Sequence, residues 1–363
     1  MIVREEEVNI GKCLESVQNI VDEMIIVDTG SRDNTVSIVQ SFGATVFYHA
    51  WQDDFSTARN ISLDHAKGEW ILILDADEVL AEESKTAVRA LTLIKDVPGY
   101  LVQIQKYHNW TEITGLRLFK KSLGLRFKGI FNEILEVPDN IYSQLIPSDI
   151  KIIHKDWSEE DFKRKLSRNT NLLKKHINLY PDSIDQILDL VMIYLKIEKL
   201  SEAEALLQKV WLNLPLKKDG KRSYNRYLLL YYYYKLHLLY KKSADFESRS
   251  SICKEALSVR PQSPLFVYEA AKAYYKSGDY AKAIKHFEQC LTFGKRHDFN
   301  RSVMFPKAIL GANSLAGLGY CFFKLHNYQI AAQYFNKSYS LKKDKKIQFM
   351  LNASRSLLKR QVS

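Results

Sequence analysis

A chain of 363 residues is too long for one ordinary hydrophobic core, so length alone predicts two domains. Charge divides the chain as well, since residues 1–150 carry a net charge of −9 and residues 151–363 a net charge of +20. The basic half suits an anionic partner such as an acidic peptide, a polysaccharide precursor or a lipid headgroup, and equally suits lysines solvated on helix surfaces. Charge alone does not indicate a nucleic-acid partner, and none is expected.

The cysteines and the hydropathy indicate a soluble, reduced protein. The four cysteines lie far apart without CxxC spacing, which excludes the usual zinc and disulfide patterns and favours reduced, cytoplasmic thiols. The sequence shows no signal-peptide pattern, and its most apolar late stretch, residues 227–240, is too short and too rich in Tyr to span a bilayer.

The first 80 residues alternate between strand and helix patterns. We expect strands at residues 24–28, 44–48 and 70–75, and helices at 8–20, 34–42 and 56–66, with Asp33 and Ser56 as N-caps. This alternation predicts a parallel, doubly wound sheet. Strand patterns at 100–105, 115–119, 130–137 and 150–154 then predict an antiparallel extension, followed by a helix at 159–179.

The run from Trp70 to Glu78 carries the strongest chemical signal. Its apolar part predicts a buried parallel strand that ends at Asp75 and Asp77, whose side chains would point the same way because strand side chains alternate. Ligands bind at the carboxyl ends of such strands, and two carboxylates there suit a divalent cation beside a substrate phosphate. The run therefore predicts a nucleotide-dependent enzyme.

Two further segments belong with this run. The segment Ile25–Thr35 reads as a strand, a tight turn and a capped helix, which places Asp28 where a base and ribose bind. The segment Trp51–Asn60 places Arg59 in the first turn of the helix before the Asp75 strand, where a guanidinium can pair with a diphosphate.

From about residue 183 every pattern is helical, and the helices repeat. Residues 268–287 resemble a tetratricopeptide repeat, as do segments near 194–215 and 319–335, with a degenerate copy near 246–261. The equivalent positions Ala203, Arg249, Ala283 and Ala331 are 46, 34 and 48 residues apart, so only one interval has the standard period. Aromatic residues such as Tyr231–Tyr234 are interpreted as core packing, and stacked pairs leave a concave surface typical of peptide binding.

Taken in order, these motifs resemble family 2 glycosyltransferases of the GT-A fold, in the bacterial branch that is fused to tetratricopeptide repeats and includes sublancin-type peptide S-glycosyltransferases. The resemblance rests on VREE, VDTGSRDNT, DFSTARN and LDADE and continues through GLRLFK, FKGIFNE and the Ile153–His154 pair. It implies an α/β GT-A domain, Rossmann-like with a mostly parallel sheet, followed by an all-α repeat domain. The predicted boundaries are 1–157, a connecting helix at 158–182, and repeats at 183–363.

The resemblance also implies a role for each site residue. Asp75 and Asp77 would bind Mg²⁺ or Mn²⁺ against the diphosphate of a nucleotide sugar, which is expected to be a UDP-hexose. His154 would complete the set of groups around the metal or the diphosphate. In the nucleotide-sugar pocket, Asp28 would hold the base or ribose and Arg59 the diphosphate, while residues Val3 and Arg4 would line it. Glu133 would be the general base of an inverting transfer, with a salt-bridged structural carboxylate as the alternative.

Two departures from the family pattern stand out. Asn132 occupies the position before Glu133 where the family usually has His, which leaves the orientation of the acceptor or base open. The first strand, expected at the very start of the chain, is cut to about three residues, which is expected to weaken the floor of the nucleotide pocket.

Alternatives remain at the level of function. Residues 72–80 also fit the first motif of haloacid-dehalogenase-like phosphatases, but the downstream Lys and acidic cluster that those enzymes need do not follow. A degenerate, non-catalytic repeat scaffold is a second alternative. For an active enzyme, the acceptor is expected to be a peptide or protein docked by the repeats, or else a glycan or lipid-linked acceptor of cell-surface polysaccharide or lipopolysaccharide assembly. Contact with the inner face of the membrane and a homodimer are left open.

Overall fold

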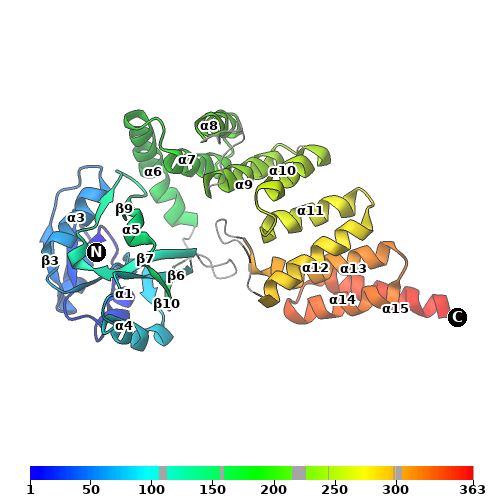
Figure 1. Cartoon of the computed structure of the whole chain (residues 1–363), viewed down its shortest axis with the longest axis horizontal. Coiled ribbons are helices and arrows are strands. Elements are labelled where there is room, and N and C mark those ends of the chain that lie inside the picture. Colours follow the sequence, from blue (N-terminus) through cyan, green and yellow to red (C-terminus); the bar gives the residue numbers. More distant parts are fainter. Residues whose placement is uncertain are drawn as a thin grey trace. The chain divides into compact units, whose positions relative to one another are not determined.

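The computed structural model describes residues 1–105, 113–155, 159–214, 226–243, 245–296, 299 and 305–362 (Figure 1). The chain forms two compact units that divide between Gln186 and Ile187. The first unit combines strands and helices, and the second is helical throughout its described residues. The boundaries predicted at residues 157 and 182 stay predictions.

A parallel three-stranded sheet begins the first unit, in the order β1 (Ile2–Val3), β2 (Ile25–Asp28) and β3 (Thr45–Tyr48). Helices α1 (Ile10–Val17) and α2 (Thr35–Ser41) cover it through a core that includes Val3, Leu14, Ile26 and Val39. Alternation of strand and helix along the sequence, as predicted, builds this parallel sheet.

The first strand is short, as the sequence predicts. Met1 Nα donates to Ile25 O at 2.8 Å, and Val3 pairs with Asp28. A cavity of about 350 Å³ lies beside it, and its lining includes Met1, Ile25, Trp70 and Ile71. Among the described residues, no strand of the three-stranded sheet is hydrogen-bonded to the sheet that holds Trp70.

A mixed five-stranded sheet forms the rest of the framework. Its strand order is β4 (Trp70–Leu72), β7 (Ile113–Lys120), β6 (Gly99–Gln105), β10 (Ile146–His154) and β5 (Glu78–Leu80). Only β6 and β10 are parallel neighbours; the other pairs are antiparallel.

The strand predicted at residues 70–75 needs correction on two points. It ends at Leu72, and it pairs antiparallel with β7, where Ile71 faces Phe119. A strand buried on both faces is an apolar run whatever the direction of its neighbour, so the run itself held no information on direction.

Four helices and a hairpin complete the first unit: α3 (Phe55–His65), α4 (Lys85–Thr92), α5 (Asp139–Tyr142), α6 (Glu159–Leu179) and the pair β8 (Arg126–Lys128) and β9 (Ile134–Glu136).

The predicted N-cap Ser56 is wrong. Asp54 caps α3 by accepting the Thr57 amide at 3.1 Å, because its carboxylate lies one residue outside the first turn. Asn34 takes the cap position of α2, while Asp33 accepts the Thr35 amide at 3.0 Å.

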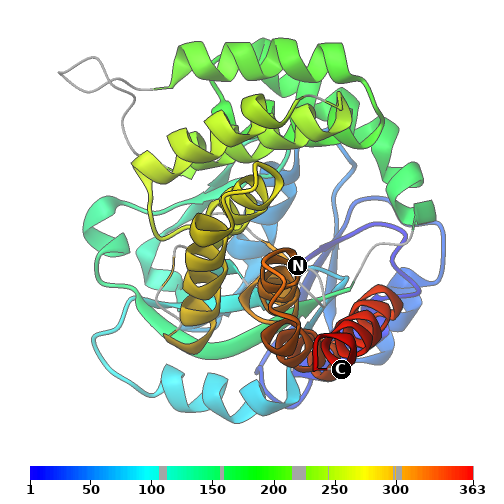
Figure 2. The same cartoon turned by 90° about the vertical axis from the view of Figure 1, so that its right-hand side faces the viewer.

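Nine helices are described from residue 184 onward, and from the second of them to the last each packs beside the next (Figure 2). They are α7 (Ile184–Lys196), α8 (Leu200–Asn213), α9 (Arg226–Lys241), α10 (Phe246–Val259), α11 (Pro264–Lys276), α12 (Tyr280–Arg296), α13 (Ala312–Lys324), α14 (Tyr328–Leu341) and α15 (Lys345–Val362). The predicted repeat positions Ala203, Ala283 and Ala331 are all fully buried, whereas Arg249 stacks its guanidinium 4.8 Å from the Tyr240 ring centroid. Across the described residues we find no helix with the length and apolarity that a bilayer crossing requires.

Candidate active site

The candidate site lies where β4 gives way to the turn that leads into β5. The Glu78 amide donates to Asp75 O at 3.0 Å, and the buried Glu78 carboxylate accepts the Asp75 amide at 2.9 Å. This reciprocal contact fixes the backbone of the predicted metal motif. It also places a second acid, Glu78, directly behind Asp75.

Arg59 of α3 joins Asp75 to Glu133. Its terminal nitrogen lies 2.6 Å from Asp75 Oδ1, and its Nε donates to the Glu133 carboxylate. The guanidinium also lies 5.3 Å from the centroid of the Phe127 ring. The structure thus brings three of the predicted site residues into one ion-pair network, in which the predicted base Glu133 and the predicted metal ligand Asp75 share the Arg59 guanidinium.

Arg117 of β7 is a fourth member of this network. It lies 3.0 Å from Glu78 Oε1 and 3.6 Å from Asp75 Oδ2. Burial on its own would raise the pKa of the Asp75 carboxyl, but the two arginine charges outweigh it and hold that pKa well below its usual range. Burial, assisted by the Asp75 charge, raises the pKa of Glu78. Of this pair, Asp75 is therefore the more acidic carboxyl group.

Asp77 has a different set of partners. Its Oδ1 lies 3.6 Å from His154 Nε2, and its Oδ2 lies 3.7 Å from Nζ of Lys165 on α6. Strand β10 brings His154 here, because His154 is the register partner of Glu78 in β5. The backbone amide of the next residue, Lys155, donates to Asp77 O at 2.8 Å. Asp75 therefore contacts arginines, and Asp77 contacts the end of β10 and α6.

Glu133 lies in the loop between β8 and β9. Two backbone features shape this loop: Asn132 has a φ of 48° and Gly129 a φ of 104°. Asn tolerates the left-handed region better than most residues, so the departure at position 132 agrees with the local backbone. The Phe55 amide, at the start of α3, donates to Ile130 O at 3.1 Å and ties the loop to the helix that carries Arg59.

Three residues predicted to bind the nucleotide, Val3, Arg4 and Asp28, lie at the three-stranded sheet. Val3 and Asp28 are register partners across β1 and β2, and Arg4 follows as an exposed residue. The buried Asp28 carboxylate accepts the amides of Gly30 at 3.0 Å and Ser31 at 3.1 Å. These bonds rigidify the turn after β2; the contact with a base or ribose stays a prediction.

The donors around Asp77 suit a divalent cation better than those around Asp75. Mg²⁺ is usually held by one or two carboxylates together with substrate phosphates. Asp77 and His154 offer an oxygen and a nitrogen at one place, whereas both Asp75 oxygens contact arginines. Over the described part of the chain, no group of three or more His, Cys, Asp or Glu side chains is arranged to hold a metal ion. A metal role for Asp75 stays a prediction.

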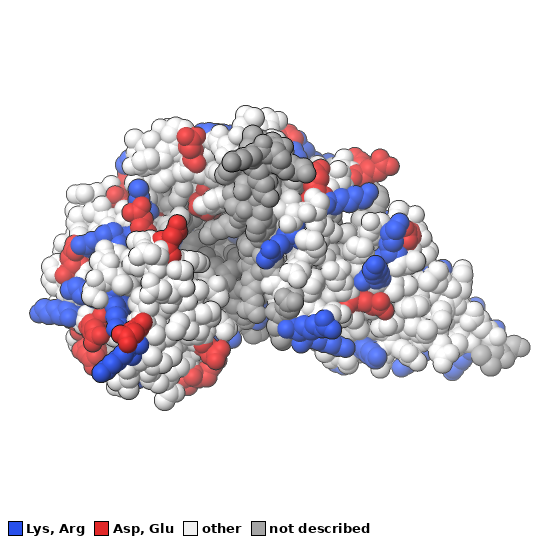
Figure 3. Space-filling view, in the orientation of Figure 1, with Lys and Arg blue, Asp and Glu red and all other residues white. Residues whose placement is uncertain are grey.

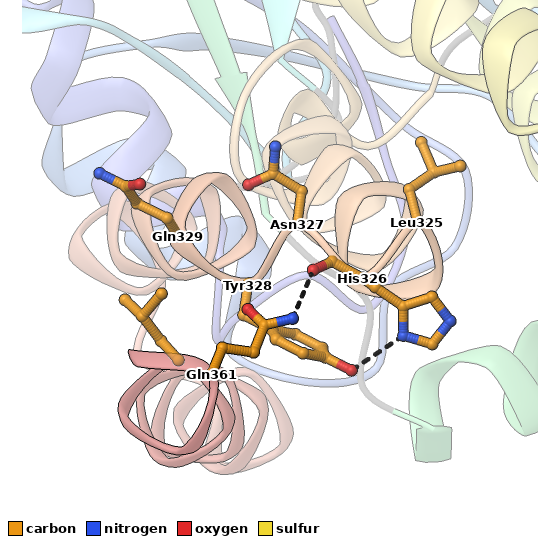
Figure 4. Close-up of a pocket in the computed structure, with 7 residues that line it drawn as sticks. Leu325, His326, Asn327, Tyr328, Gln329 and Gln361 are labelled. Atoms are coloured by element: carbon orange, nitrogen blue, oxygen red, sulfur yellow. Dashed lines mark hydrogen bonds between the residues drawn. The ribbon is translucent and has the colours of Figure 1, made fainter. Parts of the chain in front are cut away.

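A second cavity, of about 260 Å³, lies in the helical unit and contains none of the predicted residues (Figure 4). His326 Nδ1 lies 2.9 Å from Tyr328 Oη there, and Gln361 donates to the His326 carbonyl at 3.5 Å. Among the residues that the structure describes, no Asp, Glu, Lys or Arg lines it.

Comparison with known families assigns both units. The family described as "Glycosyl transferase family 2" matches residues 1–144, and the family described as "Tetratricopeptide repeat" matches residues 264–296. The chain contains a family 2 glycosyltransferase domain followed by tetratricopeptide-like repeats. This confirms the resemblance and the fold class predicted from the sequence, with a mixed rather than mostly parallel set of sheets.

Three relatives show how far the similarity extends. A TPR repeat-containing protein of Synechococcus elongatus is 37% identical over 38% of this chain and 34% of its own length. The SPbeta prophage-derived glycosyltransferase SunS of Bacillus subtilis is 30% identical over 50% of this chain and 45% of its own length. An uncharacterized glycosyltransferase of Rickettsia bellii is 34% identical over 28% of this chain and 34% of its own length. The chain thus spans less than half the length of each of these relatives.

Sequence reasoning missed three members of the site. Arg117 lay in a recognised strand motif, but its pairing with the acids depends on β7 lying beside β4. Glu78 was read only as the end of the acidic motif. Lys165 lay in a correctly predicted helix, and no local pattern distinguishes it from the other lysines of α6.

Proposed function

We propose that this chain is a metal-dependent, inverting glycosyltransferase that moves a hexose from a nucleotide sugar, UDP-hexose by expectation, to an acceptor side chain. One observation carries the proposal: Arg59 bridges Asp75 and Glu133 inside a family 2 glycosyltransferase domain. A donor diphosphate and an acceptor nucleophile would be handled by one connected network.

In the proposed reaction, Glu133 takes the proton from the acceptor hydroxyl or thiol. The acceptor oxygen or sulfur then forms a bond to the anomeric carbon, and the bond from that carbon to the phosphate oxygen breaks on the opposite face. The nucleoside diphosphate leaves with the electron pair. One displacement of this kind inverts the configuration at the anomeric carbon.

Arg59 must change partners for Glu133 to act as a base. A carboxylate that is paired with a guanidinium is a weaker proton acceptor, because the ion pair stabilises its charged form. Guanidinium groups also bind phosphate in bidentate fashion. We infer that the donor diphosphate draws Arg59 away from Glu133 and so activates the base only when the donor is bound.

The metal ion would be Mg²⁺ or Mn²⁺, held by Asp77 and His154 together with the diphosphate. When bound, it supplies positive charge that stabilises the leaving phosphate. Asp75 would keep Arg59 and Arg117 in position beside it.

The acceptor would be a peptide or protein docked by the repeats. Tetratricopeptide stacks generally bind peptides, and the second half of the chain is strongly basic. Lys and Arg side chains are spread over the visible face of the repeat unit (Figure 3). An acidic leader next to the modified residue fits this distribution. A cytoplasmic location, contact with a membrane surface and a homodimer stay predictions.

Isothermal titration of the full chain with UDP and with UDP-glucose, each with and without Mn²⁺, tests the donor site. Wild type should bind only with the metal, and Asp77→Ala should lose at least about 10-fold in affinity because a carboxylate ligand is gone. Asp64→Ala, in the exposed pair with Arg126, is the matched control. Binding that ignores the metal, or is absent altogether, would favour the degenerate scaffold.

A further inference from the structure

We propose that Lys165 of α6 is a further positioning residue of the donor site, whose ammonium group binds the donor diphosphate. This inference rests on the proposed function. It concerns a residue outside the part of the chain that matches the glycosyltransferase family, since that match ends at residue 144. The helix that carries Lys165 would then belong to the donor site as well as connect the two units.

The first argument is position. Lys165 Nζ lies 3.6 Å from Glu6 Oε1 and 3.7 Å from Asp77 Oδ2, and its side chain is only 14% exposed. Glu6 belongs to the segment after β1, and Asp77 to the segment after β4. One ammonium group thus lies between carboxylates from the two segments that the donor is expected to contact.

The second argument is the looseness of these contacts. Charged N–H···O hydrogen bonds are about 2.7–2.9 Å long, and Arg59 and Arg117 approach their carboxylates at 2.6 and 3.0 Å. Lys165 is at least 3.6 Å from both acids. Neither of these two contacts has the length of a charged hydrogen bond, so the ammonium balances the charges of Glu6 and Asp77 from a distance, and its flexible stem lets it reorient toward a new anion.

The third argument is competition for Asp77. A divalent cation held by Asp77 and His154 would repel the ammonium that lies beside the same carboxylate. The incoming diphosphate offers new anionic oxygens at that moment, and lysine is a common ligand of phosphate. Lys165 would therefore exchange Asp77 for phosphate when donor and metal bind together.

This exchange predicts two effects of opposite sign for Lys165→Met. Mn²⁺ alone should bind several-fold tighter, because a competing cation is removed from Asp77. UDP in saturating Mn²⁺ should bind about 10-fold weaker, because a charge-assisted contact of the order of 1.4 kcal/mol is lost. A residue that only supports the fold would weaken both.

Isothermal titration of the full chain with Mn²⁺, and with UDP in saturating Mn²⁺, measures both effects. Lys165→Arg keeps the charge and should stay within about 3-fold of wild type for UDP. Lys175→Met is the matched control. Lys175 lies on the same helix, ten residues or about 15 Å along it from Lys165, and contacts a different acid, Asp53, at 3.6 Å with a half-exposed side chain. It should change neither affinity.

Unchanged UDP affinity in Lys165→Met, or a parallel loss of Mn²⁺ and UDP binding, would overturn the inference while the proposed function stood. If wild type itself binds no UDP in the presence of Mn²⁺, the proposed function fails and takes this inference with it. A thermal melt of each variant shows that the comparison is made on folded protein.

Discussion

The two units of this protein use their buried space differently. In the glycosyltransferase domain, α3 and the turn after β4 bury charges: Arg59, Glu78 and Glu133 contact one another or Asp75 and Arg117. In the repeat unit, buried space holds alanines and rings that fit against glycines. Burying charge is costly unless every group is paired, so the first arrangement is explained by chemistry and the second by packing.

Glycines show the packing of the repeat unit most directly. A Cβ atom added to Gly317 of α13 would lie 2.5–2.6 Å from three atoms of the Phe287 ring, and one added to Gly319 would lie 2.7 Å from two atoms of the Phe335 ring. No side chain larger than hydrogen fits between helix and ring at these positions. If this contrast between the units is correct, substitutions in the buried charge network should affect donor binding and rate, whereas substitutions at these packed glycines should affect stability alone.

The largest effect is expected for Arg59→Met. It leaves the buried Glu133 carboxylate and the partly exposed Asp75 carboxylate without their shared cation, which costs about 3–5 kcal/mol in the free energy of unfolding and abolishes metal-dependent donor binding. Urea denaturation and titration with UDP measure the two losses. Arg126→Met is the control: Arg126 also lies 2.6 Å from a carboxylate, that of Asp64, but the pair is exposed and should be worth under about 1 kcal/mol.

Glu133→Gln should come next, because it removes the proposed base and keeps the side chain's shape. With an alcohol acceptor, the rate of transfer should fall by about 10²–10⁴-fold. With a thiol acceptor, the fall should be under about 10-fold, since thiols ionise readily. Initial rates with matched Ser and Cys peptides separate these cases, and equal losses for both acceptors would indicate a structural role for Glu133.

Gly317→Ala tests the repeat unit. Replacing a helical glycine by alanine normally stabilises a helix by about 1 kcal/mol, but here the methyl group meets the Phe287 ring and should destabilise the chain by about 1–3 kcal/mol. Adding Phe287→Leu should recover part of that loss. UDP affinity should not change in either variant.

Gly11→Ala in α1 is the control for this change, because the added Cβ would meet only Ile38 Cγ2 at 3.9 Å, an ordinary contact. It should be neutral or stabilising. If Gly317→Ala behaves in the same way, the tight fit between α13 and the Phe287 ring is not what the structure indicates.

The smallest effect is the pH dependence that Asp75 contributes. Its pKa is lowered in the folded chain, since the charges of Arg59 and Arg117 outweigh the opposing effect of burial. The unfolded chain therefore binds the proton first as the pH falls, and the stabilisation is present above about pH 4 and lost below it. The difference in unfolding free energy between wild type and Asp75→Asn should shrink from about pH 5 to about pH 2. A constant difference over that range would show that the carboxylate charge contributes nothing.

Local patterns predicted most of the elements but little of the way in which they join. Helix α6 has the predicted ends, and the strands after residue 24 begin within a few residues of their predicted starts in most cases. Periodicity and capping are properties of neighbouring residues, which is why they can be read from the sequence. The direction of β4 could not be read, because it is decided by β7, more than 40 residues further on.

The site shows the same division. Asp75, Arg59 and Glu133 were identified through motifs, and the structure brings them together. That Asp75 is held by two arginines while Asp77 contacts His154 and Lys165 could not be foreseen, because it depends on a turn that ends the strand three residues earlier than predicted. Alternation of side chains holds only while the strand continues.

The position of α6 matters for anyone who exchanges domains between enzymes of this kind. A cut at residue 144, where the family match ends, would remove both His154 and Lys165. The amide of Lys155, which holds the backbone of Asp77, would be lost with them. A transplant that is meant to give an existing glycosyltransferase a new repeat domain should therefore be joined after α6 ends at Leu179 and before α7 begins at Ile184, so that α6 stays with the first domain.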